Sequence, residues 1–271
     1  MTKSGLAFKK LTHFCTFVPD FSRGALMKEK IQQDNLPKHI AVIMDGNGRW
    51  AKKQGAARIF GHKSAVKSVR DVTEGCAELG IQFLTLYAFS TENWNRPKFE
   101  VTALMELLVS TLSSEIKTLM DNNIKLASIG DKASLPEKCQ RELEEAIEKT
   151  KSNNGMTLIL ALSYSGRWDI TQASKRIALD VAAGVLKADE ISQNTIDKYL
   201  VTSGIPDPEL LIRTSGELRI SNFLLWQMAY TEFFITETLW PDFRKEHLYQ
   251  AIISYQERER RFGKISEQLK Q

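Results

Sequence analysis

Six residues with the chemistry of an anion site follow the first strongly apolar segment of the chain. They are Asp45-Gly46-Asn47-Gly48-Arg49-Trp50. The two glycines let backbone N–H groups approach an anion closely, and a helix starting there would add partial positive charge. Residues 46–70 include seven Lys or Arg and no Asp or Glu. This pattern favours a local anion site, with a solvated basic helix face as the alternative.

Asp45 places a carboxylate directly beside this basic, glycine-rich turn. A carboxylate next to a phosphate is favourable when a divalent cation joins them, and Mg²⁺ binds one or two carboxylates together with substrate phosphates. Arginine supplies a planar, permanently charged fork for phosphate oxygens. The combination indicates a diphosphate site that uses Mg²⁺. An ordinary helix-capping aspartate is the other interpretation of Asp45, and His62 taken alone is typical of a structural histidine.

Two further polar segments follow apolar runs in the same way. One is Ser90–Arg96, in which Trp94 stands among polar neighbours, and the other is Arg213–Asn222, which turns at a glycine. The side chains they offer to an anion are Ser90, Asn93 and Arg96 in the first and Arg213, Arg219 and Ser221 in the second. Glu232 and Asp242 come later, and a turn or capping role is the more typical reading of Asp242.

The elements that must position these segments alternate along the chain. Short apolar runs predict strands at His39–Met44, Ile81–Phe89, Ile124–Ile129, Met156–Leu162, Leu210–Ile212 and Phe233–Thr236. Helical periodicity between them predicts a helix closed by Gly80, a long helix over Glu100–Met120, one opened by Pro136, one over Trp168–Ala183 and a terminal helix over Glu246–Phe262.

Strand–helix alternation of this kind predicts an α/β fold, a single domain with an open, mostly parallel sheet of about six strands surrounded by helices. In such sheets, ligands bind beyond the carboxyl ends of the strands. We therefore expect the three polar segments to meet at one edge of the sheet. The domain is expected over residues 34–271, with residues 1–33 as a flexible arm; translation from Met27 is a further hypothesis.

Composition narrows the class of protein. The chain has 271 residues, 42% of them hydrophobic and 26% charged, which is typical of a globular protein. Residues 1–38 carry seven Lys or Arg against three Asp or Glu, so the rest of the chain is neutral and has no charge excess for nucleic acid. The three scattered cysteines suit a reducing, cytoplasmic compartment better than a disulfide framework or a zinc site.

A dinucleotide-binding oxidoreductase is one alternative function. Gly46, Gly48 and Ala51 match a loose Gly-x-Gly-x-x-Ala pattern. However, Asp45 would face the pyrophosphate, and the acidic residue expected about 20 residues further on is missing. This alternative is therefore disfavoured.

Together these segments resemble the cis-prenyltransferase family. The similarity runs from His39 to Gly263 and is strongest in His39–Gly61, Leu84–Pro97, Ile212–Tyr230 and Arg258–Gly263. The resemblance implies that isopentenyl diphosphate is condensed onto an allylic diphosphate, normally farnesyl diphosphate, with Mg²⁺, and that the new double bonds are cis. It implies a sheet with helices around a hydrophobic tunnel, a homodimer, and a cytoplasmic enzyme that visits the inner face of the membrane to release its product.

The resemblance also implies a role for each residue that matches a position of the family's motifs. Asp45 would be the metal-binding catalytic aspartate, Glu232 a second metal ligand, and His62 an aid to the departing diphosphate. Asn93 matches the position assigned to proton transfer, although orienting a water or a diphosphate oxygen is easier for an amide. The implied substrate contacts are Gly46, Asn47, Gly48, Arg49, Trp50, Arg58 and His62 for the allylic diphosphate; Ser90, Thr91, Glu92, Trp94 and Arg96 in the second segment; and Arg213, Arg219, Ile220 and Ser221 for isopentenyl diphosphate.

The chain departs from the family pattern at Ala65, Ser163 and Ser165, where Gly, Asn and Gly are usual. A non-catalytic partner subunit is the rival within the family, but such a subunit should lack Asp45, His62, Asn93 or Arg96. The apolar face of the Glu100–Met120 helix is expected to serve both as core and as tunnel lining, and Met156 is expected near the far end of the tunnel. Product length is not fixed by the sequence.

Overall fold

The computed structural model describes residues 26–261 together with 263, 265 and 268. Its centre is one six-stranded sheet in the order β3-β4-β2-β1-β5-β6, and every pairing is parallel. The strands are β1 (His39–Ile43), β2 (Phe83–Ser90), β3 (Lys125–Ile129), β4 (Thr157–Tyr164), β5 (Leu210–Arg213) and β6 (Glu232–Ile235). The predicted α/β class and the single open parallel sheet are confirmed.

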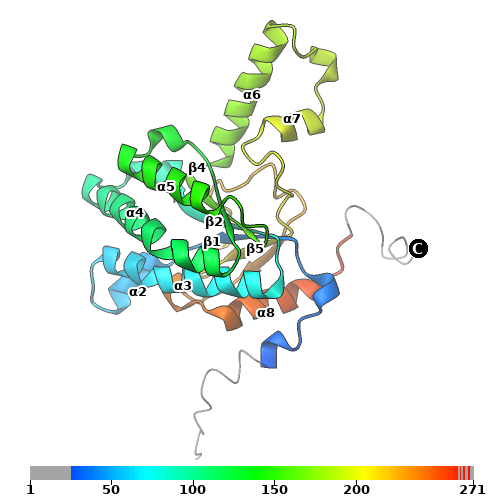
Figure 1. The fold of residues 1–271 in the computed structure, drawn as a ribbon. Coiled ribbons are helices and arrows are strands. Elements are labelled where there is room, and N and C mark those ends of the chain that lie inside the picture. The colour runs from blue at the N-terminus through cyan, green and yellow to red at the C-terminus, as the bar shows by residue number, and fades with distance from the viewer. Residues whose placement is uncertain (1–25, 262, 264, 266–267, 269–271) are drawn as a thin grey trace, which may run out of the picture.

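The helices follow the strands, as the alternation predicts (Figure 1). They are α2 (Asn47–Lys53), α3 (Arg58–Leu79), α4 (Lys98–Asp121), α5 (Glu137–Thr150), α6 (Gly166–Ala182), α7 (Gln193–Tyr199) and α8 (Lys245–Gln256). Single 3₁₀ turns occur at η1 (Gln33–Asn35), η2 (Thr91–Asn95), η3 (Lys132–Ser134), η4 (Ala188–Glu190) and η5 (Trp240–Asp242). Helices α6 and α7 form an arm that projects from the body of the molecule.

The sheet is buried on both faces because its strands are apolar on both. In β1, Ile40 and Val42 belong to the larger core cluster, which also contains residues of α3, α4, α5 and α8. Ala41 and Ile43 point the other way, into a smaller cluster with Phe223 and the other apolar residues after β5. This two-sided burial explains the continuous apolar runs of the sequence.

The terminal helix is shorter than predicted. It ends at Gln256, not at Phe262, which lies outside the described residues. The side chain of Gln256 donates to the backbone oxygens of Gln32 and Asn35, and the side chain of Arg258 pairs with Glu232 at 2.8 Å. These long-range bonds hold the end of the helix and the residues after it against residues 32–35 and β6, which apolar periodicity does not reveal. Helix α7 was not predicted.

Of the predicted N-terminal arm, residues 1–25 lie outside the described part of the chain. Among residues 26–33, Ile31 is buried in the larger core, and the backbone N–H of Gln32 donates to Gln256. A domain boundary at residue 34 stays a prediction. Cys76 and Cys139 are free and buried, whereas Cys15 is not described. None of the described helices is long and apolar enough to cross a membrane.

His39 gives the fold a pH-dependent stability. Its Nδ1 lies 2.6 Å from the oxygen of Pro206 and its Nε2 2.7 Å from the hydroxyl of Thr85. Burial lowers its pKa from 6.5 to about 4, against the opposing effect of the Pro206 bond. The native state therefore holds His39 neutral, while the unfolded chain takes up a proton below pH 6.5. Stability from this group is complete above pH 6.5 and is lost as the pH falls toward 4.

We expect His39→Asn to remove about 2 kcal/mol of the difference in unfolding free energy between pH 7.5 and pH 5. Urea unfolding at the two pH values, on both proteins, measures this. An equally steep pH dependence in the variant would contradict the assignment.

Candidate active site

A cavity of about 460 Å³ opens at the carboxyl ends of β1, β2 and β5. All three predicted polar segments contribute to its mouth, which confirms that they meet at one edge of the sheet. The polar residues that line it there are Asp45, Gly46, Asn47, Gly48, Arg58, His62, Ser90, Asn93, Arg96, Arg213, Arg219 and Ser221.

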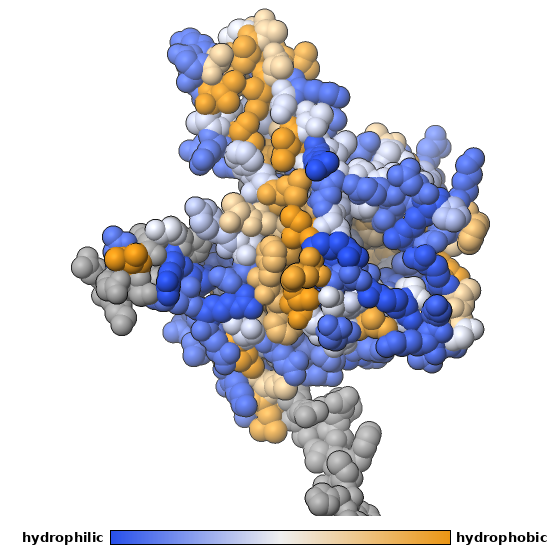
Figure 2. Space-filling model, turned by 180° about the vertical axis from the view of Figure 1, so that it is seen from behind, coloured by the Kyte–Doolittle hydropathy of each residue, from blue (hydrophilic) through white to orange (hydrophobic). Residues whose placement is uncertain are grey.

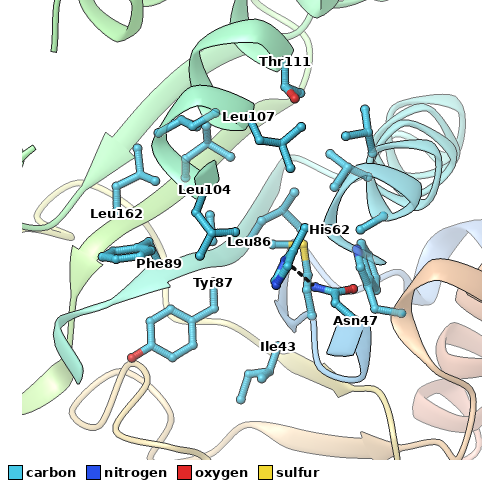
Figure 3. A pocket seen from close by; sticks show the side chains of 18 of the residues that line it. Ile43, Asn47, His62, Leu86, Tyr87, Phe89, Leu104, Leu107, Thr111 and Leu162 are labelled. Carbon is cyan, nitrogen blue, oxygen red and sulfur yellow. Dashed lines mark hydrogen bonds between the residues drawn. The ribbon is translucent and has the colours of Figure 1, made fainter. Parts of the chain in front are cut away.

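Beyond this mouth the cavity is a hydrophobic tunnel. It runs between the sheet and helices α3 and α4, and Figure 3 shows Leu104 and Leu107 of α4 pointing into it opposite Leu86 and Phe89 of β2. Its far end is lined by Leu119, Leu126 and Leu158. Leu126 and Leu158 lie near the starts of β3 and β4, whereas the mouth lies at the carboxyl ends of the strands. The tunnel therefore extends along most of the length of the strands. Met156 is buried in the neighbouring core and is not among the described lining residues.

Asp45 is the carboxylate at the centre of the mouth. One oxygen accepts from the backbone N–H of Gly46 at 2.7 Å, and the other accepts from Arg213 at 2.9 Å. Arg49 lies 3.5 Å from the first oxygen. Burial, the largest single influence, acts to raise the pKa of Asp45, but the bond and charge of Arg213, the Gly46 N–H and Arg49 together hold it below the ordinary value. Asp45 is therefore ionised at neutral pH.

The glycines of the turn are required by close contacts. Gly46 has a φ of +107°, and a Cβ there would lie 2.9 Å from Leu239. A Cβ on Gly48 would lie 3.0 Å from Nε of Arg58, so the missing side chain lets that guanidinium lie over the turn. Gly61 of α3 is likewise required by a close contact, because a Cβ there would lie only 2.0 Å from the backbone oxygen of Asn47. Helix α3 therefore approaches the start of α2 closely.

His62 projects from α3 toward this turn (Figure 3). Its Nδ1 lies 3.3 Å from Nδ2 of Asn47. Burial, together with the positive charges of Arg96 and Arg58, lowers its pKa from 6.5 to about 4, against the pull of Glu100. The ring is therefore neutral. Because an amide nitrogen only donates, Nδ1 accepts and the proton sits on Nε2. Nε2 is buried with no partner among the described residues, so a donor is available there.

Glu100 is a site residue that the sequence analysis missed. Its side chain is only 7% exposed, and it lies 3.1 Å from Arg96 and 3.8 Å from Nε of Arg58. Glu100 therefore holds two arginine side chains from different segments, Arg58 and Arg96, beside His62. The available signal was its position four residues after Arg96 at the start of a helix, where such pairs form.

The segment after β2 forms the 3₁₀ turn η2, and its side chains divide into two groups. Ser90, Asn93 and Arg96 face the cavity, and Oδ1 of Asn93 accepts from the Ser90 N–H at 3.1 Å. This bond fixes the amide, so its NH₂ group remains to donate elsewhere. The others bind protein groups: Thr91 donates to Ser165 at 2.9 Å, Trp94 donates to Ser163 at 2.9 Å, and Glu92 accepts from Asn222 at 2.7 Å.

Two of the departures from the family pattern have local explanations. Ser163 has a φ of +48°, a conformation that asparagine tolerates well, and its hydroxyl accepts from Trp94. Ser165 caps the start of α6 by accepting from the Trp168 N–H at 3.4 Å. Both serines hold η2 in place. Ala65 is buried and lines the tunnel next to His62.

The loop after β5 completes the mouth. Arg213, whose side chain is 3% exposed, donates to Asp45 and to Ser221 at 2.9 Å each, and also to the backbone oxygen of Arg219. Ser215, Ser221, Asn222 and Leu224 all have positive φ. Several non-glycine residues in this strained conformation mark a loop held in place by its surroundings, as is frequent at functional sites.

Some residues expected at the site lie beside it. Arg49 pairs with Glu217 at 3.0 Å and donates to Ser215 behind the turn. Trp50 donates to Asp242 at 2.7 Å and stacks on Phe60. Ile220 packs against the smaller core cluster. None of the three is among the described residues that line the cavity.

Comparison with known proteins identifies the family. The sequence profile described as "Putative undecaprenyl diphosphate synthase" matches residues 43–263. The chain belongs to this prenyltransferase family. It is 57% identical over 235 residues to an isoprenyl transferase of Chlorobaculum tepidum, covering 87% of this chain and 89% of that one. It is 51% identical over 245 residues to the ditrans,polycis-undecaprenyl-diphosphate synthase ((2E,6E)-farnesyl-diphosphate specific) of Vibrio vulnificus, covering 90% and 98%.

Two solved structures share the fold of this prenyltransferase. Lavandulyl diphosphate synthase from Lavandula x intermedia, in complex with dimethylallyl diphosphate, has a TM-score of 0.84 and 40% identity. A probable undecaprenyl diphosphate synthase from Campylobacter jejuni has a TM-score of 0.71 and 36% identity. Each comparison covers 85% of this chain and all of the other. The enzyme is therefore a prenyl-group transferase.

Within one chain, Glu232 does not reach Asp45. Glu232 opens β6 opposite Leu210, the first residue of β5, whereas Arg213 at the other end of β5 contacts Asp45. Three residues of strand separate the two levels, roughly 10 Å. The Glu232 carboxylate pairs with Arg258 instead. Across the described residues, no group of three or more His, Cys, Asp and Glu side chains could hold a metal ion by itself.

Proposed function

We propose that this prenyltransferase condenses isopentenyl diphosphate repeatedly onto farnesyl diphosphate and makes a long-chain polyprenyl diphosphate, undecaprenyl diphosphate, for the lipid carrier of cell-wall synthesis. The observation that carries the proposal is the combination of a cationic mouth with a long apolar tunnel behind it. Such a cavity suits an amphiphile with a diphosphate head and a hydrocarbon tail. The names of the bacterial relatives support the choice of primer and product.

The allylic diphosphate is proposed to bind at the turn between β1 and α2. The N–H groups of Asn47 and Gly48 open α2 there, and Arg58 lies over Gly48. Arg49 adds positive charge from behind the turn. Isopentenyl diphosphate is proposed to bind at Arg213, Arg219 and Ser221 of the loop after β5, all of which line the mouth. In this arrangement the allylic tail enters the tunnel while the two reacting carbons meet near Asp45.

Magnesium is proposed as the cofactor, and the donor set at the mouth fits it. Asp45 supplies one ionised carboxylate that is 31% exposed toward the cavity, which matches an ion that takes few protein ligands and completes its shell with phosphate oxygens and water. When bound, Mg²⁺ would neutralise charge on the diphosphate of the substrate. Glu232 as a second ligand stays a proposal that one chain alone does not satisfy.

The enzyme's own groups account for the chemistry as follows. As the allylic C–O bond breaks, negative charge grows on the leaving diphosphate. Arg58 and the N–H donor at Nε2 of His62 stabilise that charge without any need to reorganise. Holding the homoallylic alkene in line with the allylic carbon removes much of the entropic barrier. The fixed NH₂ group of Asn93 orients the diphosphate oxygen that accepts the proton lost when the new double bond forms.

A further proposal concerns assembly. We propose that two copies form a homodimer through the face seen in Figure 2, where apolar side chains cover the projecting arm and continue as a strip down the body. Large exposed apolar residues include Leu179, Val185 and Ile191 on the arm and Phe233 on β6. Strand β6 is an edge of the sheet, so part of its backbone is open to pairing. Sedimentation velocity tests this, and a monomer at micromolar concentration would contradict it.

The proposed localisation is the cytoplasm. We also propose transient contact with the inner face of the membrane, because an undecaprenyl chain is insoluble in water. Arg261 and Gly263 match a terminal Arg-x-Gly motif of the cis-prenyltransferases, and we propose that this motif reaches the partner subunit of the homodimer.

The proposed function is tested by incubating the full chain with farnesyl diphosphate, labelled isopentenyl diphosphate and MgCl₂. We expect label in the butanol-soluble lipid phase, its loss with EDTA, and its recovery with excess Mg²⁺. A folded protein that transfers no label under these conditions would contradict the proposal and favour a partner-dependent subunit.

A further inference from the structure

The tunnel contains one charged pair away from its mouth. Of the described residues that line the cavity, Arg70 of α3 and Glu115 of α4 are the charged ones outside the cluster around Asp45 and His62. Nε of Arg70 donates to one carboxylate oxygen of Glu115 at 3.0 Å, and Nη2 donates to the other. This is a bidentate salt bridge, the strongest geometry for a contact between an arginine and a carboxylate.

The pair spans the seam between the two helices that form one wall of the tunnel. One wall of the tunnel is the sheet, and the other is formed by α3 and α4 side by side (Figure 1). Helix α4 packs more closely against α5 than against α3. Val66 and Val69 of α3 face the cavity, as do Leu108 and Leu112 of α4. Because these apolar side chains face the cavity, they do less to hold the two helices together.

The two side chains of the pair differ in burial. The Glu115 side chain is 14% exposed and that of Arg70 is 48% exposed, so the carboxylate lies inside the wall and the guanidinium covers it from outside. A paired carboxylate presents little polarity to a hydrocarbon chain, whereas an unpaired one would have to turn to water and open the wall.

We propose that the Arg70–Glu115 pair is a clasp that closes the α3–α4 wall of the tunnel and thereby limits the length of the polyprenyl product. The proposal rests on the proposed chain elongation. A growing chain fills the tunnel until further condensation must push the wall outward. With the clasp closed, α3 and α4 resist this separation, and elongation stops. With the clasp broken, the seam yields and additional five-carbon units are accommodated. Arg70 and Glu115 are specificity-determining residues and not catalytic ones, since neither lies near the reacting atoms.

The test is the product-length distribution in single turnover, with enzyme in excess over farnesyl diphosphate so that product release does not contribute. Arg70→Met and Glu115→Gln keep most of the side-chain volume and remove the pair. We expect at least half of their product to be longer than the main wild-type product by one or more isoprene units. The double variant Arg70→Glu/Glu115→Arg restores an ion pair, so its distribution should return toward that of the wild type.

Lys117→Met is the matched control, because it removes an exposed ion pair with Asp121 on the same helix outside the lining of the cavity. Its product should be unchanged. Wild-type length in both single variants would overturn the clasp, and so would longer product that the reversed pair fails to shorten. If one single variant does not fold, the other is compared with the reversed pair: longer product in the single variant that the reversed pair shortens supports the clasp, and wild-type length in that single variant overturns it. Absence of any prenyl product from the wild-type enzyme would instead refute the proposed function.

Discussion

Replacing Asp45 with asparagine should lower kcat by about 10²- to 10³-fold, the usual cost of removing a preorganised electrostatic contact in a transition state. Asparagine has the same size and can still accept from the Gly46 N–H, but it carries no charge to pair with Arg213 or to hold Mg²⁺. Initial rates with saturating substrates, measured over a range of MgCl₂ concentrations, give kcat and the Mg²⁺ requirement together. We expect the variant to need more Mg²⁺ as well as to turn over slowly.

A matched control separates this effect from a loss of folding. Asp71 on α3 is also partly buried and lies 3.5 Å from Arg244, but it is not among the described residues lining the cavity. Asp71→Asn should reproduce any general loss of thermal stability while keeping kcat within about threefold, as is usual for substitutions away from a site. If Asp45→Asn also kept kcat within threefold, Asp45 would be the ordinary capping residue that the sequence alone allowed.

Arg213→Lys is expected to have the second large effect. The guanidinium bonds to Asp45, Ser221 and the Arg219 backbone from one buried position, and a lysine ammonium cannot reproduce that fork. Losing two charge-assisted bonds at about 1.5–3 kcal/mol each predicts a fall in kcat/KM for isopentenyl diphosphate of about 10²- to 10⁴-fold. Initial rates at low concentrations of isopentenyl diphosphate measure it.

The same substitution has a consequence for pH. Arg213 acts to lower the pKa of Asp45. A weaker partner lets that pKa rise, so Asp45 becomes protonated at a higher pH and the acid limb of the kcat/KM profile should move upward. Arg244→Lys is the control, because Arg244 likewise donates to several groups, namely Ser68 and the backbone of Pro241 and Phe243, away from the site. An unmoved acid limb in Arg213→Lys would show that another group controls it.

The meeting of the three polar segments was predictable from sequence because it follows from topology. Segments 45–50, 90–96 and 213–222 each begin where an apolar run ends. In a parallel sheet these ends all lie at one edge, so identifying the strands also locates the site. The tunnel was expected from the resemblance to the cis-prenyltransferases and not from topology, because an apolar helix face such as that of α4 is equally typical of an ordinary core.

Contacts between distant residues were not predictable in this way. The positive charges of Arg58 and Arg96 were visible in the sequence. Their shared partner Glu100 was signalled only by its spacing from Arg96, which is weak because an acidic residue in the first turn of a helix is commonplace. The end of α8 depends on bonds from Gln256 to residues more than 200 positions earlier. Periodicity describes one element at a time and carries no information on such pairs.

Glu232 illustrates the same limit at a single residue. The apolar run Phe233–Thr236 predicted a strand there, which β6 confirms within one residue. Its register with β5 places Glu232 at the amino end, away from Asp45. Only the pairing of strands reveals which end of the sheet a flanking carboxylate occupies. A role for Glu232 at the metal therefore stays a proposal that depends on more than one chain.

The most direct test of the central claim, that a cationic mouth feeds a long apolar tunnel, is the mass spectrum of the product made from farnesyl diphosphate and excess isopentenyl diphosphate. We predict a series of polyprenyl diphosphates ending at a sharp upper limit at the undecaprenyl chain, with the intermediates depleted. A product that stops after a single condensation would contradict the account, because the tunnel would then have no part in catalysis.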